Sequence, residues 1–446
     1  MRRNSVVGPI LLILIGLLFL TRSLWQQIPM FDLLAHYWPF ILIGWGLLRL
    51  VEVAVLAMSD KPVNSRLSGG EIMLVILLCL VGSGMMAASN HGLRIPPLGE
   101  SGVEIFGQQY DYDQNAEKPA PATVHVVFDN LRGNVRITGS DQPQVKVELH
   151  KTVRAMQKSE ADQADRETPL EIVTEGDRII VRTNQERVSG RRRIADDLEV
   201  TVPRGASIEA RATYGDFDIT DITGTVDINS ANAGVRLNKI GGNVKIDLGR
   251  SDIIRAVDVK GALDLQGKGS DIDLEDMAGQ VTINGTYSGT LQFKNLAKPL
   301  HFESRQTDLR VAQLPGSITM DLGDFTANNV VGPMRLVTRS RDIRIEDFTQ
   351  SLELESERGD IELRPGKSPL PKIDAKARNG KVDLILPDAA QFDLRISTNR
   401  GEAHNEFGPA IKTEIDGQSS TLKGSVGKGP TINITTERGT VSVKKS

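Results

Sequence analysis

A repeat of about 18 residues runs through the second half of this chain and constrains its fold more than any other feature. The repeat is marked by an apolar residue just after a turn, at Phe217, Val235, Ile253, Ile272, Leu291, Leu309, Phe325, Ile343 and Ile361. Successive markers are 18, 18, 19, 19, 18, 16, 18 and 18 residues apart. A second series, from Val226 to Leu352, lies half a period out of phase and contains the same single spacing of 16. A fixed period of this kind predicts stacked structural units.

Each half of the repeat reads as a turn followed by alternating apolar and polar residues, as in Gly215–Ile219 and Gly359–Leu363. A two-residue period predicts a short strand with one buried face, and Gly, Asn, Asp and Ser supply the turns. The pattern therefore predicts a β-solenoid of ~18-residue coils, each with two strands. A β-sandwich stays open, because short strands every 8–12 residues also suit it. Arg255 falls on an inward position and does not fit, and the spacing of 16 indicates one coil that is two residues shorter.

The regions beside the repeat differ in character. We expect a Pro-rich tether without regular structure over 90–121, a β-rich N-terminal cap over 122–204 with a short helix within 153–166, and solenoid repeats over 205–446. The final strand at 440–444 is expected to cap the far end.

The first 89 residues contain three apolar stretches, which predict transmembrane helices at about 6–22, 38–58 and 72–88. A cleaved signal peptide is less favoured, because no small-x-small site precedes Trp25. Arg2, Arg3, Lys61 and Arg66 place the N-terminus and the second loop in the cytoplasm by the positive-inside rule. The expected class is thus a membrane-anchored all-β protein, multi-pass in a bacterial inner membrane, with an extracytoplasmic C-terminal domain.

The charge and cysteine content exclude several kinds of site. Residues 1–90 carry a net charge of +2 and the rest carry −6, so a nucleic acid partner is not expected. One cysteine permits neither an internal disulfide nor a cysteine-cluster metal site. The six histidines lack metal-ligand spacing and Gly-x-Ser-x-Gly is missing, so we predict no catalytic, cofactor-binding or metal residues and no cofactor.

Acidic residues recur at one corner of the predicted coils, at Asp216, Asp252, Asp271, Asp308, Asp324, Asp342 and Asp360. Stacked carboxylates would form a cation ladder, but Asp is also a common turn residue, and the second interpretation is favoured. The basic run Arg191–Arg193 is interpreted as a solvated loop rather than as a lipid or glycan contact.

Two sequence patterns resemble known bacterial families. Gly8–Leu20 and Trp38–Gly44 resemble the paired helices of LiaI/LiaF-like envelope-stress proteins over roughly residues 5–57. Leu198–Gly205, Tyr214–Ile219 and the repeated Gly-Asp-Ile-x-Leu units resemble the "putative adhesin" (toast-rack-like) β-solenoid family over roughly 120–446. The resemblance implies envelope-stress sensing without catalytic residues. Three predicted helices, where LiaF-like proteins usually have four, depart from that family.

The leading expectation for function is a non-catalytic envelope protein whose solenoid binds a ligand or partner in envelope-stress sensing. The alternatives are a membrane-anchored surface adhesin or scaffold and, with less support, a polysaccharide-active solenoid enzyme. Expected partners are the lipid bilayer, a membrane sensor kinase or another envelope protein, and a glycan or lipid ligand. The residues that bind the ligand are not identified from the sequence.

Overall fold

The structure is a computed structural model that describes residues 108–155, 157–188, 194–366 and 369–446, together with six isolated helical positions between residues 43 and 80. The chain divides into two compact units, Met1–Gln108 with Ala155–Lys158, and Gln109–Arg154 with Ser159–Ser446. Nearly all described residues belong to the second unit.

Helix is scarce in the described residues. Their one continuous α-helix is α4 (Lys158–Glu167), close to the short helix expected within 153–166, and the 3-10 helices η1 (Gln185–Arg187) and η3 (Gly408–Ala410) are single turns. Within these ranges, no helix has both the length and the apolar character that crossing a bilayer requires. The predictions of three transmembrane helices and a multi-pass inner-membrane location are therefore not supported, and the fold class is corrected to all-β. The stretches 6–22, 38–58 and 72–88 lie outside the described residues, apart from the six isolated positions.

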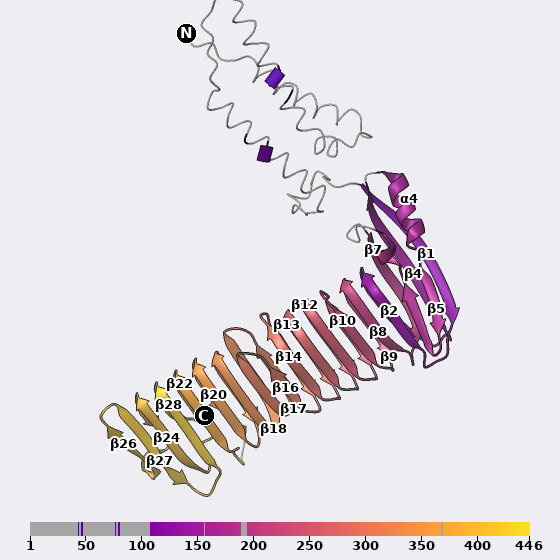
Figure 1. The fold of residues 1–446 in the computed structure, drawn as a ribbon. Coiled ribbons are helices and arrows are strands. Elements are labelled where there is room, and N and C mark those ends of the chain that lie inside the picture. Colours follow the sequence, from indigo (N-terminus) through magenta and orange to yellow (C-terminus); the bar gives the residue numbers. More distant parts are fainter. Residues whose placement is uncertain are drawn as a thin grey trace, which may run out of the picture. The chain divides into compact units, whose positions relative to one another are not determined.

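The second unit is a β-solenoid whose coils contribute one strand to each of two stacks (Figure 1). The first stack runs, in spatial order, through β6 (Arg178–Arg182), β2 (His125–Arg132), β8 (Ser207–Tyr214), β10 (Val226–Ser230), the first halves of β12 (Val244–Val259) and β13 (Leu263–Met277), β14 (Val281–Tyr287) and β16 (Leu300–Glu303). The second runs through β7 (Ile194–Pro203), β3 (Val135–Ser140), β9 (Phe217–Ile222), β11 (Val235–Ile240), the second halves of β12 and β13, and β15 (Leu291–Leu296).

The register confirms the predicted repeat over this part of the chain. Val226 lies beside Val244, Val244 beside Leu263, and both pairings are parallel. Along each strand the inward residues are buried and the outward residues are polar, so the inward apolar side chains of both stacks form one core. Parallel pairing of successive coils identifies a solenoid, since a β-sandwich pairs its strands mainly in antiparallel fashion.

The misfit at Arg255 is explained by an irregularity in β12. The register between β12 and β13 shifts between Leu248 and Ser251. As a result Ile254, not Ile253, lies beside Val235 and is fully buried, while Arg255 points outward and pairs with Asp273 (Nε–Oδ2 3.4 Å). A bulge of one residue moves every following side chain to the other face, and here it restores the alternation.

The predicted short coil is instead a coil that runs in reverse. β17 (Thr307–Met320) pairs antiparallel with β15 and β16 on one side and with β18 (Asp324–Ser340) on the other. The buried Arg341 guanidinium donates hydrogen bonds to Thr307 Oγ1, Thr338 Oγ1 and the Asp321 carbonyl beside the second reversal. The spacing of 16 therefore marks two hairpins, and inward alternation continues because it does not depend on strand direction.

At the N-terminal end, the spatial order of the coils differs from their order in the chain. The coil of β6 and β7 stacks outside that of β2 and β3, although it follows it in sequence. The intervening chain forms β4 (Gln144–Ala155), which pairs antiparallel with β7, then α4, and β5 (Glu171–Glu175), which pairs antiparallel with β6. Part of the expected tether is instead the strand β1 (Gln108–Pro119), which pairs with β4.

The C-terminal end also departs from chain order. After β18 come β19 (Asp342–Phe348), β20 (Leu352–Arg358), β21 (Ile361–Arg364), β22 (Ile373–Asn379), β23 (Val382–Leu386), β24 (Phe392–Arg400), β25 (Ala403–Asn405), β26 (Ile411–Asp416), β27 (Ser419–Val426), β28 (Thr431–Arg438) and β29 (Val441–Lys445). β28 lies between β22 and β24, and β29 lies between β23 and β25. The prediction that the last strand caps the stack is therefore wrong, because β25 pairs with the outer side of β29, and the hairpin of β26 and β27 ends the other stack (Figure 1).

One corner of the coils is built from residues in the left-handed backbone region. These residues have φ between 50° and 65° and recur at equivalent places, at Asp221, Lys239, Asp258, Asp276, Asn295, Asn329 and Asp347. Asp and Asn tolerate this conformation better than other residues with a Cβ. The corner thus accounts for a periodic Asp/Asn signal separate from the acidic positions considered above.

Candidate ligand-binding groove

A surface hollow crosses six neighbouring strands of the second stack and its extension, β1, β4, β7, β3, β9 and β11. It has a volume of about 720 Å³. Its polar lining is dominated by six carboxylates, from Asp113, Glu148, Asp197, Glu199, Asp216 and Asp218. Among the described lining residues, only Arg136, Arg236 and His150 are basic, so this lining has an excess of acidic groups.

The strand register places five of these charged side chains next to one another in a row across the groove. Glu148 lies beside Glu199, Glu199 beside Arg136, and Arg136 beside Asp218. Arg236 continues the row on β11. All five are outward residues of strands whose other residues face the core, so the period-two alternation that builds the core also presents this charged row to solvent.

The charged groups of the groove pair through exposed contacts. Arg136 lies 3.2 Å from Glu199 (Nη1–Oε1) and 3.8 Å from Asp218 (Nε–Oδ2). His150 Nδ1 lies 2.8 Å from Asp113 Oδ1, and this hydrogen bond raises the pKa of the imidazole. Solvent-exposed pairs contribute little stability and exchange readily with other ions. These side chains are therefore available to an incoming charged ligand.

The acidic corner serves as a set of turn caps. The Oδ1 atoms of Asp216, Asp271, Asp342 and Asp360 each accept a hydrogen bond of 2.8–2.9 Å from a backbone N–H of the next coil. Asp308 instead pairs with Arg335 (2.6 Å) and Arg310 (3.1 Å). The turn interpretation of these residues is confirmed at the four capping positions. Across the described ranges, no group of three His, Cys, Asp or Glu side chains is placed to hold a metal ion.

The described histidines are spread over the surface. His125, His301 and His404 each lie 3.2–3.7 Å from a carboxylate of a neighbouring strand or residue. His36, His91 and the Arg191–Arg193 run fall outside the described residues. The four described histidines are thus not gathered into one site, and of these four His150 lines the groove.

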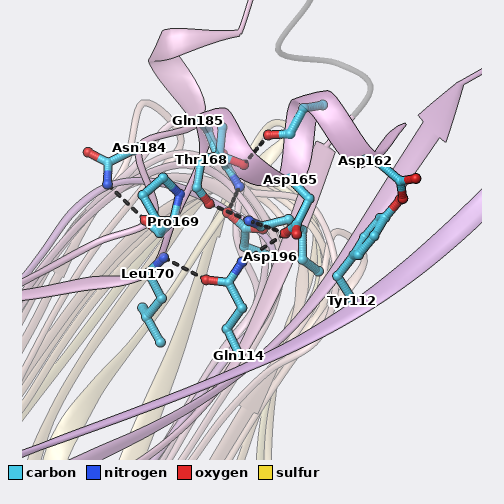
Figure 2. A network of polar contacts seen from close by, with 12 residues as sticks. Tyr112, Gln114, Asp162, Asp165, Thr168, Pro169, Leu170, Asn184, Gln185 and Asp196 are labelled. Carbon is cyan, nitrogen blue, oxygen red and sulfur yellow. Dashed lines mark hydrogen bonds and ion pairs between the residues drawn. The ribbon is translucent and has the colours of Figure 1, made fainter. Parts of the chain in front are cut away.

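A buried polar network lies behind the groove, where α4 packs on β1 and β4 (Figure 2). The fully buried Lys151 Nζ contacts Asp165 Oδ1 at 3.0 Å and donates a hydrogen bond to the Thr168 carbonyl. Gln185 Nε2 donates to Asp196 Oδ2 at 2.6 Å and to the Arg132 carbonyl at 3.0 Å. These contacts join the inserted segment to the first coils, so we assign the network a structural role.

Asp196 is the perturbed group in this network. Burial raises the pKa of its carboxyl to about 6, against the opposing effects of the Gln185 hydrogen bond and the nearby Lys151. Its second oxygen, Oδ1, is buried without a hydrogen-bond partner among the described residues. Such a group costs stability when it is ionised.

A smaller hollow has a volume of about 410 Å³ and lies over the first stack, lined by residues that include Asp129, Arg182, Glu186 and Arg211. Its acidic and basic residues are balanced, so it carries no excess charge. Neither hollow is predictable from the residue pattern, because each is assembled from coils that are distant in the chain. The available signal was the alternation of charged residues within 146–150 and 197–199, interpreted only as strands.

Comparison with known proteins identifies the family of the solenoid. The family model described as "Toastrack DUF4097" matches residues 125–444. This match begins beyond residues 5–57, so the LiaI/LiaF-like resemblance is not shown by it. No curated protein matches the chain.

Solved structures also align with the chain, at low similarity. A "putative cell adhesion protein" from Clostridium sporogenes is 9% identical, with a TM-score of 0.17, over 75% of this chain and 100% of that one. A "putative lipid binding protein" from Parabacteroides distasonis is 10% identical, with a TM-score of 0.22, over 75% and 96%. A "putative adhesin" from Bacteroides fragilis is 11% identical, with a TM-score of 0.20, over 75% and 97%. The family match covers well over half of the sequence, and the chain belongs to the toastrack DUF4097 family.

Proposed function

We propose that this chain is a non-catalytic binding protein and that the acidic groove binds a basic, extended polypeptide segment of a partner. The observation that carries the proposal is the excess of carboxylates in the described lining of the groove, six against two arginines and one histidine. An acidic surface attracts and orients cationic partners over the Debye length, about 8 Å at physiological salt.

The openness of the groove also favours an extended ligand. The groove is a surface hollow across successive strands, and neighbouring strands lie ~4.8 Å apart. A chain lying across the strands therefore meets a charged side chain at each step. The apolar lining is small, with Val135, Leu149 and Leu198, so a lipid tail is a poorer match to it than a polar segment.

We further propose that this binding serves envelope-stress regulation. The basic segment would then belong to a sensor kinase or another envelope protein. A reporter of envelope stress, measured in cells that carry the wild-type gene or a deletion, tests this part. Induction that is unchanged by the deletion, together with a glycan-array signal for the purified chain, would favour the alternative role in adhesion.

The binding experiment uses the full chain and a lysine octamer as probe, with isothermal titration calorimetry at two salt concentrations. The groove variant carries Asp113→Asn, Glu148→Gln, Glu199→Gln and Asp218→Asn. A charge-matched control carries Glu353→Gln, Asp388→Asn, Glu402→Gln and Glu437→Gln, far along the stack. We expect the groove variant to weaken binding about tenfold and the control by less than about twofold, with affinity falling as salt rises.

Equal losses in the two variants would mean that only the overall charge attracts the probe, and the groove assignment would be abandoned. Circular dichroism of both variants checks that each keeps the β-rich fold, since the altered side chains lie on the surface.

A further inference from the structure

Beyond β16 the first stack continues through β17, β18, β20, β22, β28, β24 and β27, and β26 is its outermost strand at the C-terminal end (Figure 1). On one side it pairs antiparallel with β27, from Ile411 beside Gly424 to Asp416 beside Ser419. Among the described residues, no strand pairs with its other side. At the start of this edge the Ile411 N–H already donates to the Gly408 carbonyl, and the Ile411 carbonyl accepts from Asn405 Nδ2 at 3.4 Å. The outward backbone groups farther along the strand are open to pairing with another strand.

The edge also carries an uncovered apolar side chain. Ile411, Thr413 and Ile415 share the inward face of β26, yet only Ile411 is buried, and Ile415 is 75% exposed. On β27 the corresponding residues Ser420 and Leu422 are buried. An open edge with an exposed isoleucine is a feature that soluble β-proteins generally avoid unless something pairs with it.

The sequence of this edge is complementary to itself. It reads Ile411-Lys412-Thr413-Glu414-Ile415, so its charges have opposite signs on either side of a central threonine. We propose that two copies of this chain associate end to end through β26, by antiparallel pairing about a two-fold axis at Thr413. This register sets Lys412 opposite Glu414 of the second copy twice, and Ile411 opposite Ile415 twice. It is an isologous interface, the commonest kind in homodimers.

Other registers of the same edge are less favourable by charge. Centring the axis on Lys412 or on Glu414 places like charges directly opposite each other at the axis, and the Glu414-centred register keeps that repulsion although it sets Lys412 opposite Asp416 twice. Parallel in-register pairing places like charges opposite each other at both positions. Within the described chain, neither Lys412 nor Glu414 makes an ion pair with another residue. Both side chains are therefore free to pair across the interface, where directly opposite charges of unlike sign are favourable.

The β26–β27 hairpin holds the edge in place. Its two-residue turn at Gly417 and Gln418 has Gly417 at φ +59°, and the Ser419 hydroxyl donates to the Asp416 carbonyl at 2.7 Å. Behind it, Phe407 packs edge-on against the buried Phe392, with ring centroids 5.1 Å apart, and closes the end of the core. The pairing strand is thus rigidly presented, which reduces the ordering cost of association.

The test is sedimentation velocity of the full chain over a wide concentration range. We expect a reversible dimer for the wild type and for Lys412→Glu/Glu414→Lys, because the double exchange restores the pairs. Each single change sets like charges opposite each other, so Lys412→Glu alone and Glu414→Lys alone should raise the dimer dissociation constant at least tenfold. An equimolar mixture of the two single variants should dimerise again, since each supplies the sign that the other lacks.

Cysteine crosslinking tests the register in a Cys79→Ser background. Residues directly opposite each other have Cβ atoms about 5 Å apart, within reach of a disulfide after small shifts, whereas diagonal neighbours lie farther apart. Thr413→Cys should therefore crosslink on oxidation several times faster than Glu414→Cys. Equal rates, a wild type that stays monomeric at every concentration, or single variants that dimerise like the wild type would each overturn the proposal.

Discussion

Gly279 lies directly against the carbonyl oxygen of Gly261 in the preceding coil, so close that a Cβ on Gly279 would stand 2.0 Å from that oxygen. Gly261 bears the same relationship to Gly242, and Gly242 to Gly224, at 2.2 Å in each case. These glycines are needed because the coils stack backbone to backbone at this corner, with no room for a side chain.

The first prediction follows from this contact. Gly279→Ala should destabilise the domain by about 3 kcal/mol or more, because the clashing atom is backbone and cannot move aside. Gly323→Ala is the matched control, since the nearest atom to its Cβ would lie 3.7 Å away, and it should change stability by less than about 0.5 kcal/mol. Chemical denaturation followed by circular dichroism measures both, and similar losses would contradict the stacking at this corner.

The register of β12 gives the second prediction. Ile254 is fully buried, whereas Ile253 is only partly covered. Ile254→Ala should therefore cost about 2–4 kcal/mol of unfolding free energy, and Ile253→Ala less than about 1 kcal/mol. The two substitutions remove the same atoms, so their difference reports register alone. The reverse order of effects would support the regular spacing through Ile253 instead of the bulge.

The left-handed corner gives the third prediction. Asn295 has φ 53°, and its Nδ2 donates to Asp276 Oδ1 at 3.0 Å. Asn295→Val should cost about 1–2 kcal/mol, because a β-branched residue is strained in this region. Asn295→Gly, which loses the same hydrogen bond without the strain, should cost less. Asn284→Val, on an exposed position of β14, serves as the control, and a comparable loss there would rule out backbone strain as the cause.

The fourth prediction concerns pH. Burial raises the pKa of Asp196 from 3.8 to about 6, so the folded state holds this proton more tightly than the unfolded chain. The contribution of Asp196 to stability therefore falls as pH rises from about 4 to about 6 and stays low above that. One pKa unit corresponds to about 1.4 kcal/mol, so the effect is at most roughly 3 kcal/mol.

Asp196→Asn removes this titration. Relative to the wild type, the variant should gain stability between pH 4 and pH 8, as measured by urea denaturation at each pH. Asp388→Asn, whose carboxylate is exposed, controls for general charge effects. A difference between wild type and Asp196→Asn that does not change with pH would show that Asp196 has no raised pKa in the folded state.

Several parts of the solenoid could be anticipated from residue patterns. The alternation in Val226, Asp227 and Ile228 specifies which side chains face the core, because successive side chains on a strand point to opposite faces. The spacing of 18 or 19 specifies which of them stack, since equivalent residues of successive coils become neighbours. Both patterns are local and regular, and the folded domain follows both of them.

Other parts had a signal that was interpreted incompletely or wrongly. The Asp/Asn residues at the left-handed corner recur with the same period, but Asp221 and Asn295 differ in charge, so a search for acidic residues does not find this corner. The spacing of 16 between Leu309 and Phe325 is compatible with either a shorter coil or two hairpins, because a reversed strand keeps its alternation. Apolar stretches before residue 90 predicted membrane helices, which no described helix supports.

What residue patterns alone specify about this protein is its strand spacing, its buried face and its polar outer face, because these depend on neighbours a few residues or one coil apart. The acidic groove and the open edge depend on contacts that patterns do not encode. Glu199 meets Arg136 because a later coil stacks outside an earlier one, and β26 is outermost because β28 inserts between β22 and β24. The stacking order is decided by packing among segments far apart in the chain. Local periodicity does not specify this order, because it is the same for every order.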